Sequence, residues 1–330
     1  MLASLSFLYS QDQVCDKRSI CIITKEGFRG ECEFANRMKI ACARLGWEID
    51  VCDLSSFQDS NYDCDWIFTM VPKKKCSLIH DDYLILFDPI HHFFNRKGGL
   101  NKEYKSYLGF LTTYDNIDQI VGDLQHTKKQ LYPKRWYPTV QYRPYRKVIP
   151  SRLFYIIANW GNRLSDEKYK ILQSKLALTD YTSLYGISKL KDIYGEAFKG
   201  EISYDGESLI DLISEHGVCL ILHSDTHIKY EIPSGRIFEA VAASAVVISD
   251  LNPFVIKNFG DSVLYIDQNL DGSSMFEQID AHIHWIKNHS KQALIMAKKA
   301  HKILENNFLL EDQLLDFNNF RESIKFKNEH

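Results

Sequence analysis

Residues 229–250 read KYEIPSGRIFEAVAASAVVISD, and this stretch decides the fold. Ser234 is a residue type that caps helix N-termini well. The apolar residues after it recur at the spacing of one helix face, at Ile237, Phe238, Val241 and Ala242. The run VVIS at 246–249 then predicts a buried strand. A loop, a helix and a strand in this order are typical of a parallel sheet covered by helices.

Two glutamates flank the predicted helix start, Glu231 before it and Glu239 within the helix, with seven residues between them. Helix N-terminal amides attract anions, and carboxylates accept hydrogen bonds from sugar hydroxyls. The combination predicts a site for a sugar nucleotide. Glu239 taken alone has a second interpretation, because an acid early in an exposed helix interacts favourably with the helix dipole.

A second strand, loop and helix are predicted upstream. Residues 153–158 predict the strand, and residues 166–177 predict a helix capped by Ser165. The loop and the helix start carry two cations, Arg163 and Lys168. Guanidinium and ammonium groups at such a position neutralise phosphate. We therefore expect both side chains to face the diphosphate of a nucleotide.

The rest of the chain repeats this alternation. Further strands are expected at 19–24, 48–52, 66–71, 83–87, 182–185 and 218–223, and further helices at 31–45, 206–216 and from about 275 onward. This order predicts an α/β fold with parallel, helix-covered sheets. Residues 133–152 hold four prolines and six basic residues without an acid, which predicts a stiff connection between two domains. The positive charge of this segment suits contact with a phosphate or an anionic membrane. The alternative is that the segment is an ordinary basic linker.

The two motifs together resemble those of GT-B glycosyltransferases, in particular the retaining family-4 type. The segments that carry the resemblance are NRLSDEK at 162–168 and the two glutamates of 229–250. The form PSGRIFE at 233–239 is similar to the divergent group that includes spore-maturation proteins. The chain departs from family 4 at Ser234, where a glycine is usual, and at Ser244 and Val246, where the family has Gly-x-Pro.

The resemblance implies roles for four residues. Glu231 would touch the donor sugar, Glu239 would accept hydrogen bonds from the ribose, and Arg163 and Lys168 would hold the diphosphate. It also implies the GT-B fold, in which two Rossmann-like domains with parallel sheets face each other across a cleft. We expect an acceptor-side domain at 1–147, a donor domain at 148–310, and a C-terminal helix at 311–330 that crosses back to the first domain.

Other residues are expected in the cleft because they follow strands or lie in its loops. On the donor side these are Tyr204, His223, Ser224, His227, Ser234, Gly235 and Arg236, with Asp225 as a nucleophile, a base or a loop cap. On the acceptor side they are Gly27 and Gly30, in the loop EGFRGE at 26–31, and His91 and His92, after the strand at 83–87. The histidine pair suits an acceptor contact, a base, a metal or a structural role, and no third metal ligand is evident in the sequence.

Composition limits the class of protein. A hydrophobic content of 45% and a charged content of 25% are those of a globular protein, and a formal net charge of −3 argues against a general nucleic-acid binder. Eight cysteines without a Cys-x-x-Cys pair predict reduced thiols in a cytoplasmic protein. No signal peptide and no membrane-spanning run is expected. With a lipid-linked acceptor, the protein would meet the inner face of the membrane peripherally.

These observations predict a glycosyltransferase that moves a sugar from a nucleotide-sugar donor to a hydroxyl of a glycan or lipid-linked acceptor, as in the synthesis of bacterial surface polysaccharide or glycoconjugates. Arg163, Lys168 and helix amides would neutralise the departing diphosphate, so no metal or other cofactor is expected. The resemblance implies retention of anomeric configuration. Two alternatives stay open. One is another GT-B enzyme, such as a sugar-nucleotide epimerase or a transferase with a nucleoside-monophosphate sugar donor, and the other is a nucleotide-sugar-binding protein without turnover.

Overall fold

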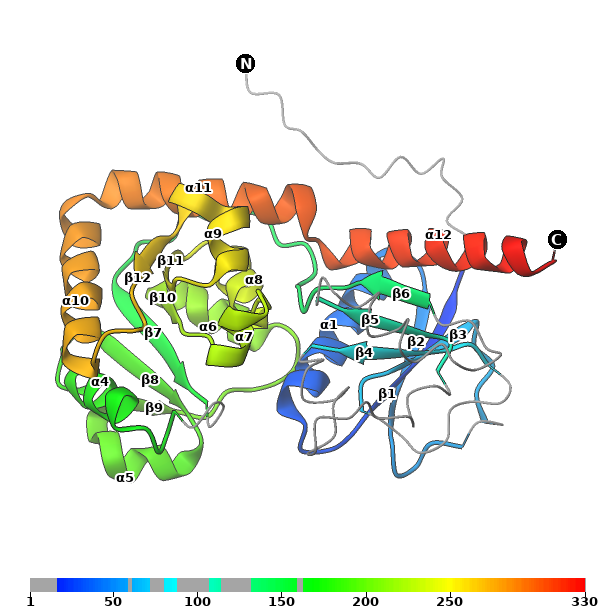
Figure 1. Cartoon of the computed structure of the whole chain (residues 1–330), viewed down its shortest axis with the longest axis horizontal. Coiled ribbons are helices and arrows are strands. Elements are labelled where there is room, and N and C mark those ends of the chain that lie inside the picture. Colours follow the sequence, from blue (N-terminus) through cyan, green and yellow to red (C-terminus); the bar gives the residue numbers. More distant parts are fainter. Residues whose placement is uncertain are drawn as a thin grey trace, which may run out of the picture.

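The chain folds into two lobes, each built on a six-stranded parallel sheet (Figure 1). The computed structural model describes residues 17–58, 61–71, 80–87, 107–113, 132–158 and 163–329, with side chains to residue 324. The first sheet has the strand order β2-β1-β3-β4-β5-β6, and the second has the order β12-β11-β10-β7-β8-β9. The predicted α/β class with two parallel sheets is confirmed.

The strands of the first sheet are β1 (Ser19–Thr24), β2 (Glu48–Asp53), β3 (Trp66–Thr69), β4 (Asp82–Leu86), β5 (Gly109–Thr112) and β6 (Tyr132–Arg135). Those of the second are β7 (Arg152–Ile157), β8 (Thr182–Gly186), β9 (Phe198–Gly200), β10 (Gly217–Ile221), β11 (Val246–Asp250) and β12 (Leu264–Ile266). The helices are α1 (Arg29–Arg44), α4 (Glu167–Ala177), α5 (Lys191–Tyr194), α6 (Ser208–His216), α7 (Asp225–Lys229), α8 (Gly235–Ala242), α9 (Pro253–Phe259), α10 (Gly272–Asn288), α11 (Ser290–Asn307) and α12 (Leu310–Glu329).

The second sheet is covered on both faces, which is why its central strands β7, β10 and β11 consist largely of continuous apolar runs. Side chains alternate between the faces along each strand. Phe154 of β7 packs in one cluster with α6, α8 and α11, whereas its neighbours Leu153 and Tyr155 pack in another with α4 and α10. This two-sided core fixes the loops that follow the strands.

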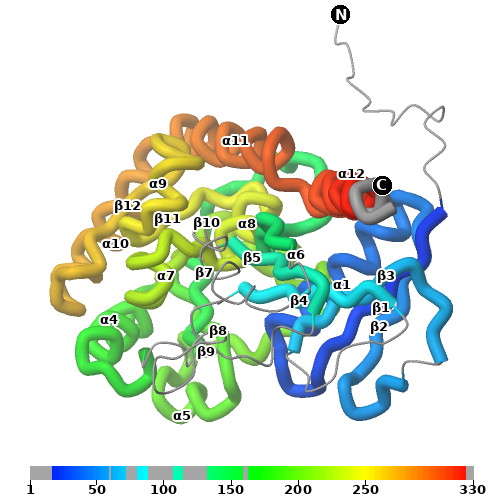
Figure 2. Tube along the Cα trace, turned by 45° about the vertical axis from the view of Figure 1, so that its right-hand side comes forward, coloured from blue at the N-terminus to red at the C-terminus, as the bar shows by residue number. Residues whose placement is uncertain are grey.

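Helix α12 packs against the first lobe although it follows helices of the second. Its Leu310, Leu314 and Phe317 are buried in one cluster with Trp66 and Phe68 of β3. In Figure 2, α11 passes over the second sheet and the chain continues as α12 along the first lobe. The last helix therefore ties the two lobes together. The predicted domain boundaries at 147/148 and 310/311 themselves stay predictions.

Three local predictions were wrong. The N-cap of α4 is Asp166, not Ser165, because Asp166 Oδ1 accepts a hydrogen bond from the backbone N–H of Lys168 at 2.9 Å. Helix α1 begins at Arg29, so Gly30 lies in its first turn and not in a loop. The connection predicted at 133–152 begins as the edge strand β6, where Pro133 is tolerated because an edge strand needs fewer backbone donors.

Candidate functional site

The motif segment forms a tight turn followed by a capped helix. Ser234 Oγ accepts a hydrogen bond from the backbone N–H of Arg236 at 3.3 Å, which confirms the predicted cap of α8. Before it, Glu231 has a φ of 56°, in the left-handed region. The carbonyl of buried Ile232 accepts from Asn252 Nδ2 at 3.0 Å. The turn between α7 and α8 is thus held by the loop that follows β11.

A cavity of about 280 Å³ lies between the lobes, at the start of α8. The second lobe lines it with Tyr204, Leu209, His227, Pro233, Ser234, Gly235, Arg236 and Glu239, and the first lobe lines it with Gly30, Glu31, Glu33, Phe34, Arg37, Met70, Ile85, Leu86 and Phe87. Pro138, from the connection, completes the lining among the described residues. Leu86 ends β4, so the cavity lies at the carboxyl end of that strand, where α/β sheets bind ligands.

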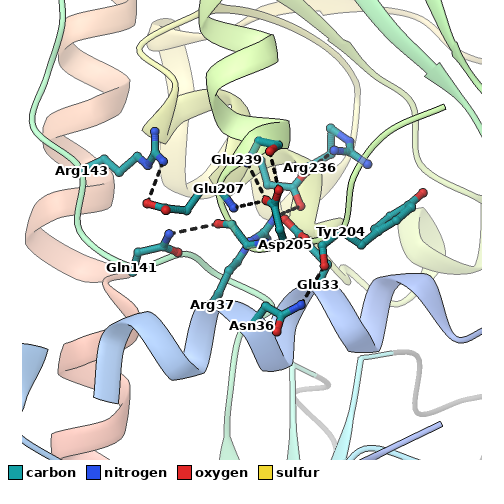
Figure 3. A network of polar contacts seen from close by, with 12 residues as sticks. Glu33, Asn36, Arg37, Gln141, Arg143, Tyr204, Asp205, Glu207, Arg236 and Glu239 are labelled. Carbon is teal, nitrogen blue, oxygen red and sulfur yellow. Dashed lines mark hydrogen bonds and ion pairs between the residues drawn. The ribbon is translucent and has the colours of Figure 1, made fainter. Parts of the chain in front are cut away.

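Glu239 lies in a buried ion network that crosses between the lobes (Figure 3). Arg37 Nη2, on α1, donates to Glu239 Oε1 at 2.6 Å, and Arg236 Nη1 donates to Glu239 Oε2. The same Arg37 nitrogen donates to Glu33 Oε1 at 2.6 Å. Glu33 Oε2 in turn accepts from the backbone N–H of Gly206 at 2.9 Å. Because Glu33, Arg37 and Glu239 are each at most 5% exposed, the network is shielded from water.

The two carboxylates of this network differ in their pKa values. Burial acts to raise the pKa of Glu239, but Arg236 and Arg37 outweigh it and hold that pKa below its ordinary value. Burial raises the pKa of Glu33, and the single shared Arg37 does not offset it, in part because Glu239 repels the Glu33 charge. As the pH falls, Glu33 therefore takes up a proton before Glu239 does, and the pair between Arg37 and Glu239 persists.

The loop at 204–206 packs directly on α1. Asn36 Nδ2 donates to the carbonyl of Tyr204 at 2.8 Å, and Gln141 Nε2 donates to the carbonyl of Gly206 at 3.0 Å. Gly206 has a φ of 89°, and a Cβ there would lie 3.0 Å from the backbone nitrogen of Arg37. Only glycine allows this approach of backbone to backbone. The loop therefore helps to fix Arg37 beside Glu239.

Arg163 and Lys168 lie beside the same aromatic ring. The Arg163 guanidinium carbon is 5.7 Å from the centroid of the Tyr169 ring, and Lys168 Nζ is 4.9 Å from it. Lys168 Nζ also donates to the carbonyl of Gln268 at 2.9 Å. Arg163 is 6% exposed, and among the described residues its Nε has no hydrogen-bond partner, which leaves this donor for a ligand. The structure brings these two cations together, but neither lines the cavity.

His223 lies beneath the site and not on its surface. Its Nδ1 is 2.7 Å from Asp250 Oδ1, its backbone N–H donates to Asp250 Oδ2, and both side chains are fully buried. This pair joins the ends of β10 and β11. Ser224 Oγ accepts from the backbone N–H of His227 at 3.2 Å, so Ser224 caps α7. Asp225 is exposed in the first turn of that helix and is not its cap.

The structure thus brings together only some of the residues expected in the cleft. The cavity is lined by Tyr204, His227, Ser234, Gly235, Arg236, Glu239 and Gly30. Glu231 is exposed on the turn before α8, outside this lining, as are Ser224, Asp225, His223, Arg163, Lys168 and Gly27. His91 and His92 lie outside the described residues. The assignment of all these residues to donor or acceptor stays a prediction.

The sequence prediction missed the contribution of α1. Glu33 and Arg37, spaced i and i+4, have the pattern of an exposed surface pair. One signal in the sequence could have indicated that Arg37 is buried. Arg37 directly precedes Met38, and Met38 lies on the apolar face of the predicted helix. Glu31, in the first turn of α1, also lines the cavity, and burial raises the pKa of its carboxyl group.

The described part of the chain contains neither a metal-binding cluster nor a membrane-spanning helix. No group of three or more His, Cys, Asp or Glu side chains lies close enough to hold a metal ion there. Within the same residues, no helix combines the length and the apolar character needed to cross a membrane.

Comparison with known proteins gives matches at the level of structure. No family model and no curated protein sequence matches the chain. Sucrose-phosphate synthase from Thermosynechococcus elongatus superposes with a TM-score of 0.58 at 10% identity, over 94% of this chain and 100% of that chain. HepE of Anabaena, solved in complex with UDP-glucose, gives a TM-score of 0.56 at 9% identity, over 92% and 99%. WaaG, a glycosyltransferase involved in lipopolysaccharide biosynthesis, gives 0.52 at 10% identity, over 90% and 99%.

These similarities extend over both lobes, since each covers nine tenths or more of this chain. The region that superposes includes both of the parallel six-stranded sheets of this chain. The chain has the GT-B fold.

Proposed function

We propose that the chain is a glycosyltransferase that moves a sugar from a nucleotide-sugar donor to an acceptor hydroxyl. The observation that carries the proposal is the position of Glu239. It lies on the capped helix α8, lines the cavity between two Rossmann-like lobes, and is kept ionised by two guanidiniums. An ionised carboxylate in a shielded cleft is suited to accept hydrogen bonds from ribose hydroxyls. The complex of HepE with UDP-glucose supports this class of donor.

The transfer step depends on charge at the leaving group. As the bond between sugar and phosphate breaks, negative charge grows on the diphosphate, and fixed cations that face it lower the barrier. We assign this role to Arg163 and Lys168, which lie beside one tyrosine ring, outside the lining of the cavity. Glu231 takes the role of a contact to the donor sugar. Protein cations then replace a metal, so the proposed reaction is metal-independent.

In the proposed reaction the transferred sugar retains its anomeric configuration. The resemblance to family 4 and to the spore-maturation group supports retention of anomeric configuration. An inverting reaction requires a base on the acceptor side. Among the described residues of the first lobe, Glu31 and Glu33 are the carboxylates that line the cavity; Arg37 holds Glu33, which leaves Glu31 for this role. The anomeric configuration of the product, read by NMR, distinguishes the two reactions.

The acceptor and the place of action are proposed on the same basis. We infer a glycan or lipid-linked acceptor in bacterial surface polysaccharide or glycoconjugate synthesis, reached from the cytoplasm or at the inner face of the membrane. WaaG, which acts in lipopolysaccharide biosynthesis, supports this kind of pathway. The basic residues of the connection between the lobes suit contact with anionic lipid headgroups.

The proposal is tested with a panel of nucleotide sugars carrying UDP, GDP, ADP, dTDP and CMP, with and without EDTA. We expect release of a nucleoside diphosphate from one donor class, and EDTA should leave the rate unchanged because Arg163 and Lys168 supply the compensating charge. Lys168→Met should reduce turnover about tenfold or more, equivalent to about 1.4 kcal/mol. Lys170→Met is the matched control, since Lys170 lies on the same helix but is exposed and faces Glu167 at 3.8 Å.

Other outcomes select the alternatives. Release of CMP alone would favour a transferase with a nucleoside-monophosphate donor, and conversion of a nucleotide sugar into its epimer would favour an epimerase. Binding of a nucleotide sugar without any product would favour a non-catalytic binding protein. Activity that returns only when Mn²⁺ or Mg²⁺ is added after EDTA would contradict the metal-independent reaction.

A further inference from the structure

We propose that Arg236 is an exchangeable counter-ion of Glu239. Its guanidinium contacts a carboxylate oxygen that ribose hydroxyls would use, and nucleotide binding moves it from Glu239 to the diphosphate. This inference rests on the proposed function, because it assumes that a nucleotide enters the cavity beside α8. It adds a regulatory step to that site.

The two arginines on Glu239 are held very differently. The side chain of Arg37 is 3% exposed and pairs with both Glu33 and Glu239. The side chain of Arg236 is 22% exposed and, among the described residues, forms an ion pair with Glu239 alone. Arg37 is therefore a fixed member of the interface between the lobes, whereas Arg236 has room to leave.

The carboxylate of Glu239 has little space for a ligand while both arginines are present. Arg37 takes Oε1 and Arg236 takes Oε2, and the Glu239 side chain is only 6% exposed. A ribose diol needs acceptor positions on the same carboxylate. Each carboxylate oxygen can accept a second hydrogen bond, but because the side chain is so deeply buried, a ribose hydroxyl reaches these oxygens only when one guanidinium moves aside.

The cost of removal decides which arginine yields. Departure of Arg37 would leave buried Glu33 without its counter-ion close to the charge of Glu239, which would keep only Arg236, and this is strongly unfavourable. Departure of Arg236 leaves Glu239 still paired with Arg37, and the partly exposed guanidinium of Arg236 regains water. Arg236 is therefore the group that exchanges.

Once it has left Glu239, the Arg236 guanidinium remains at the start of α8, close to the expected position of the diphosphate. Arg236 is in the first turn of α8, and together with Ser234 and Gly235 it lines the cavity at the helix start. The phosphate next to a ribose on Glu239 would lie at this helix start, which leaves Arg163 and Lys168, outside the cavity, for the rest of the diphosphate. A guanidinium pairs with phosphate oxygens in bidentate geometry. The exchange thus couples ribose recognition to neutralisation of the phosphates.

Calorimetric titration with matched ligands tests this exchange. The probes are uridine and UDP, adenosine and ADP, and guanosine and GDP, titrated into the wild type, Arg236→Gln and Arg143→Gln. In Arg236→Gln we expect the nucleoside to bind about threefold or more tightly, because its competitor for Glu239 is gone. A nucleoside diphosphate should bind more tightly than its nucleoside, and we expect this ratio of affinities to be about tenfold or more smaller in Arg236→Gln than in the wild type. The reason is that the variant lacks a charge-assisted contact to the phosphates.

The controls separate exchange from other roles of Arg236. Arg143 also pairs with two acids, Glu207 and Asp211, but it lies outside the cavity, so Arg143→Gln should bind every probe as the wild type does. Arg236→Lys keeps the charge and should lose less of the diphosphate gain than Arg236→Gln. Nucleoside binding that weakens or stays unchanged in Arg236→Gln would overturn the exchange. A wild type that binds none of the three diphosphates, nor dTDP, would contradict the proposed function itself.

Discussion

Replacement of Arg37 by methionine should lower the free energy of unfolding by about 3–5 kcal/mol, the usual cost of removing one partner from a buried ion pair. The reason is that Arg37 is 2% exposed and is the counter-ion of both Glu33 and Glu239. Without it, buried Glu33 loses its counter-ion and faces Glu239, which only Arg236 then neutralises. Urea unfolding followed by circular dichroism at neutral pH measures the loss.

The matched control for this variant is Arg143→Met. Arg143 also pairs with two acids, but its partners Glu207 and Asp211 are 53% and 51% exposed, so solvent screens the pairs. We expect Arg143→Met to cost about 1 kcal/mol or less. Equal losses for the two variants would mean that the network around Arg37 does not stabilise the fold. A double variant, Arg37→Met with Glu33→Gln, should recover part of the loss, because the charge left without a counter-ion is removed.

Replacement of Phe317 by alanine should cost about 3–5 kcal/mol, as for other fully buried aromatic side chains. Phe317 of α12 is fully buried, and its ring centroid lies 4.9 Å from those of Phe68 and Tyr83 and 5.7 Å from that of Trp66. Removal of the ring opens a cavity where the last helix packs on the first sheet. Thermal or urea unfolding measures the effect.

Phe320 is the matched control because it lies on the same helix. It is only partly buried, and its ring meets Tyr132 at 6.3 Å near the edge of the sheet. We expect Phe320→Ala to cost clearly less than Phe317→Ala. If both variants unfold as the wild type does, α12 does not hold the first lobe in the way the packing indicates.

The elements of the fold could be predicted because local patterns specify them. Apolar runs predicted β1, β7, β10 and β11 with ends within two residues of those found. Ser234 was recognised as a cap because capping depends on one side chain and the amides next to it. The same local reasoning failed at α4, where Ser165 and Asp166 are adjacent and both residue types cap helices.

The edge of the first sheet was missed for a related reason. Strand β5 has only four residues, and β6 contains a proline and two basic residues. Both lack the alternation or the apolar run that identifies a strand from sequence. β6 is a strand because β5 offers it a free edge, which is tertiary information.

Only the part of the candidate site that belongs to the second lobe could be predicted from the sequence. The motif residues of the second lobe, among them Glu239 and Arg236, could be found because they follow one another along the chain. Arg37 could not, since it is 202 residues away from Glu239 and only the packing of the two lobes brings them together. The burial of His223 against Asp250 likewise depends on a strand that comes later in the sequence.

The central claim, that Glu239 receives the ribose of a nucleotide donor, is tested most directly by titrating nucleoside diphosphates into Glu239→Gln and Glu231→Gln. Loss of a charged hydrogen-bond acceptor is worth about 1.5–3 kcal/mol. We therefore predict that Glu239→Gln weakens diphosphate binding roughly tenfold to a hundredfold. Glu231 is exposed on the turn outside the cavity and should contact only the sugar that is transferred. Glu231→Gln should therefore bind the free diphosphate with the affinity of the wild type. Wild-type affinity in a folded Glu239→Gln protein would contradict the claim.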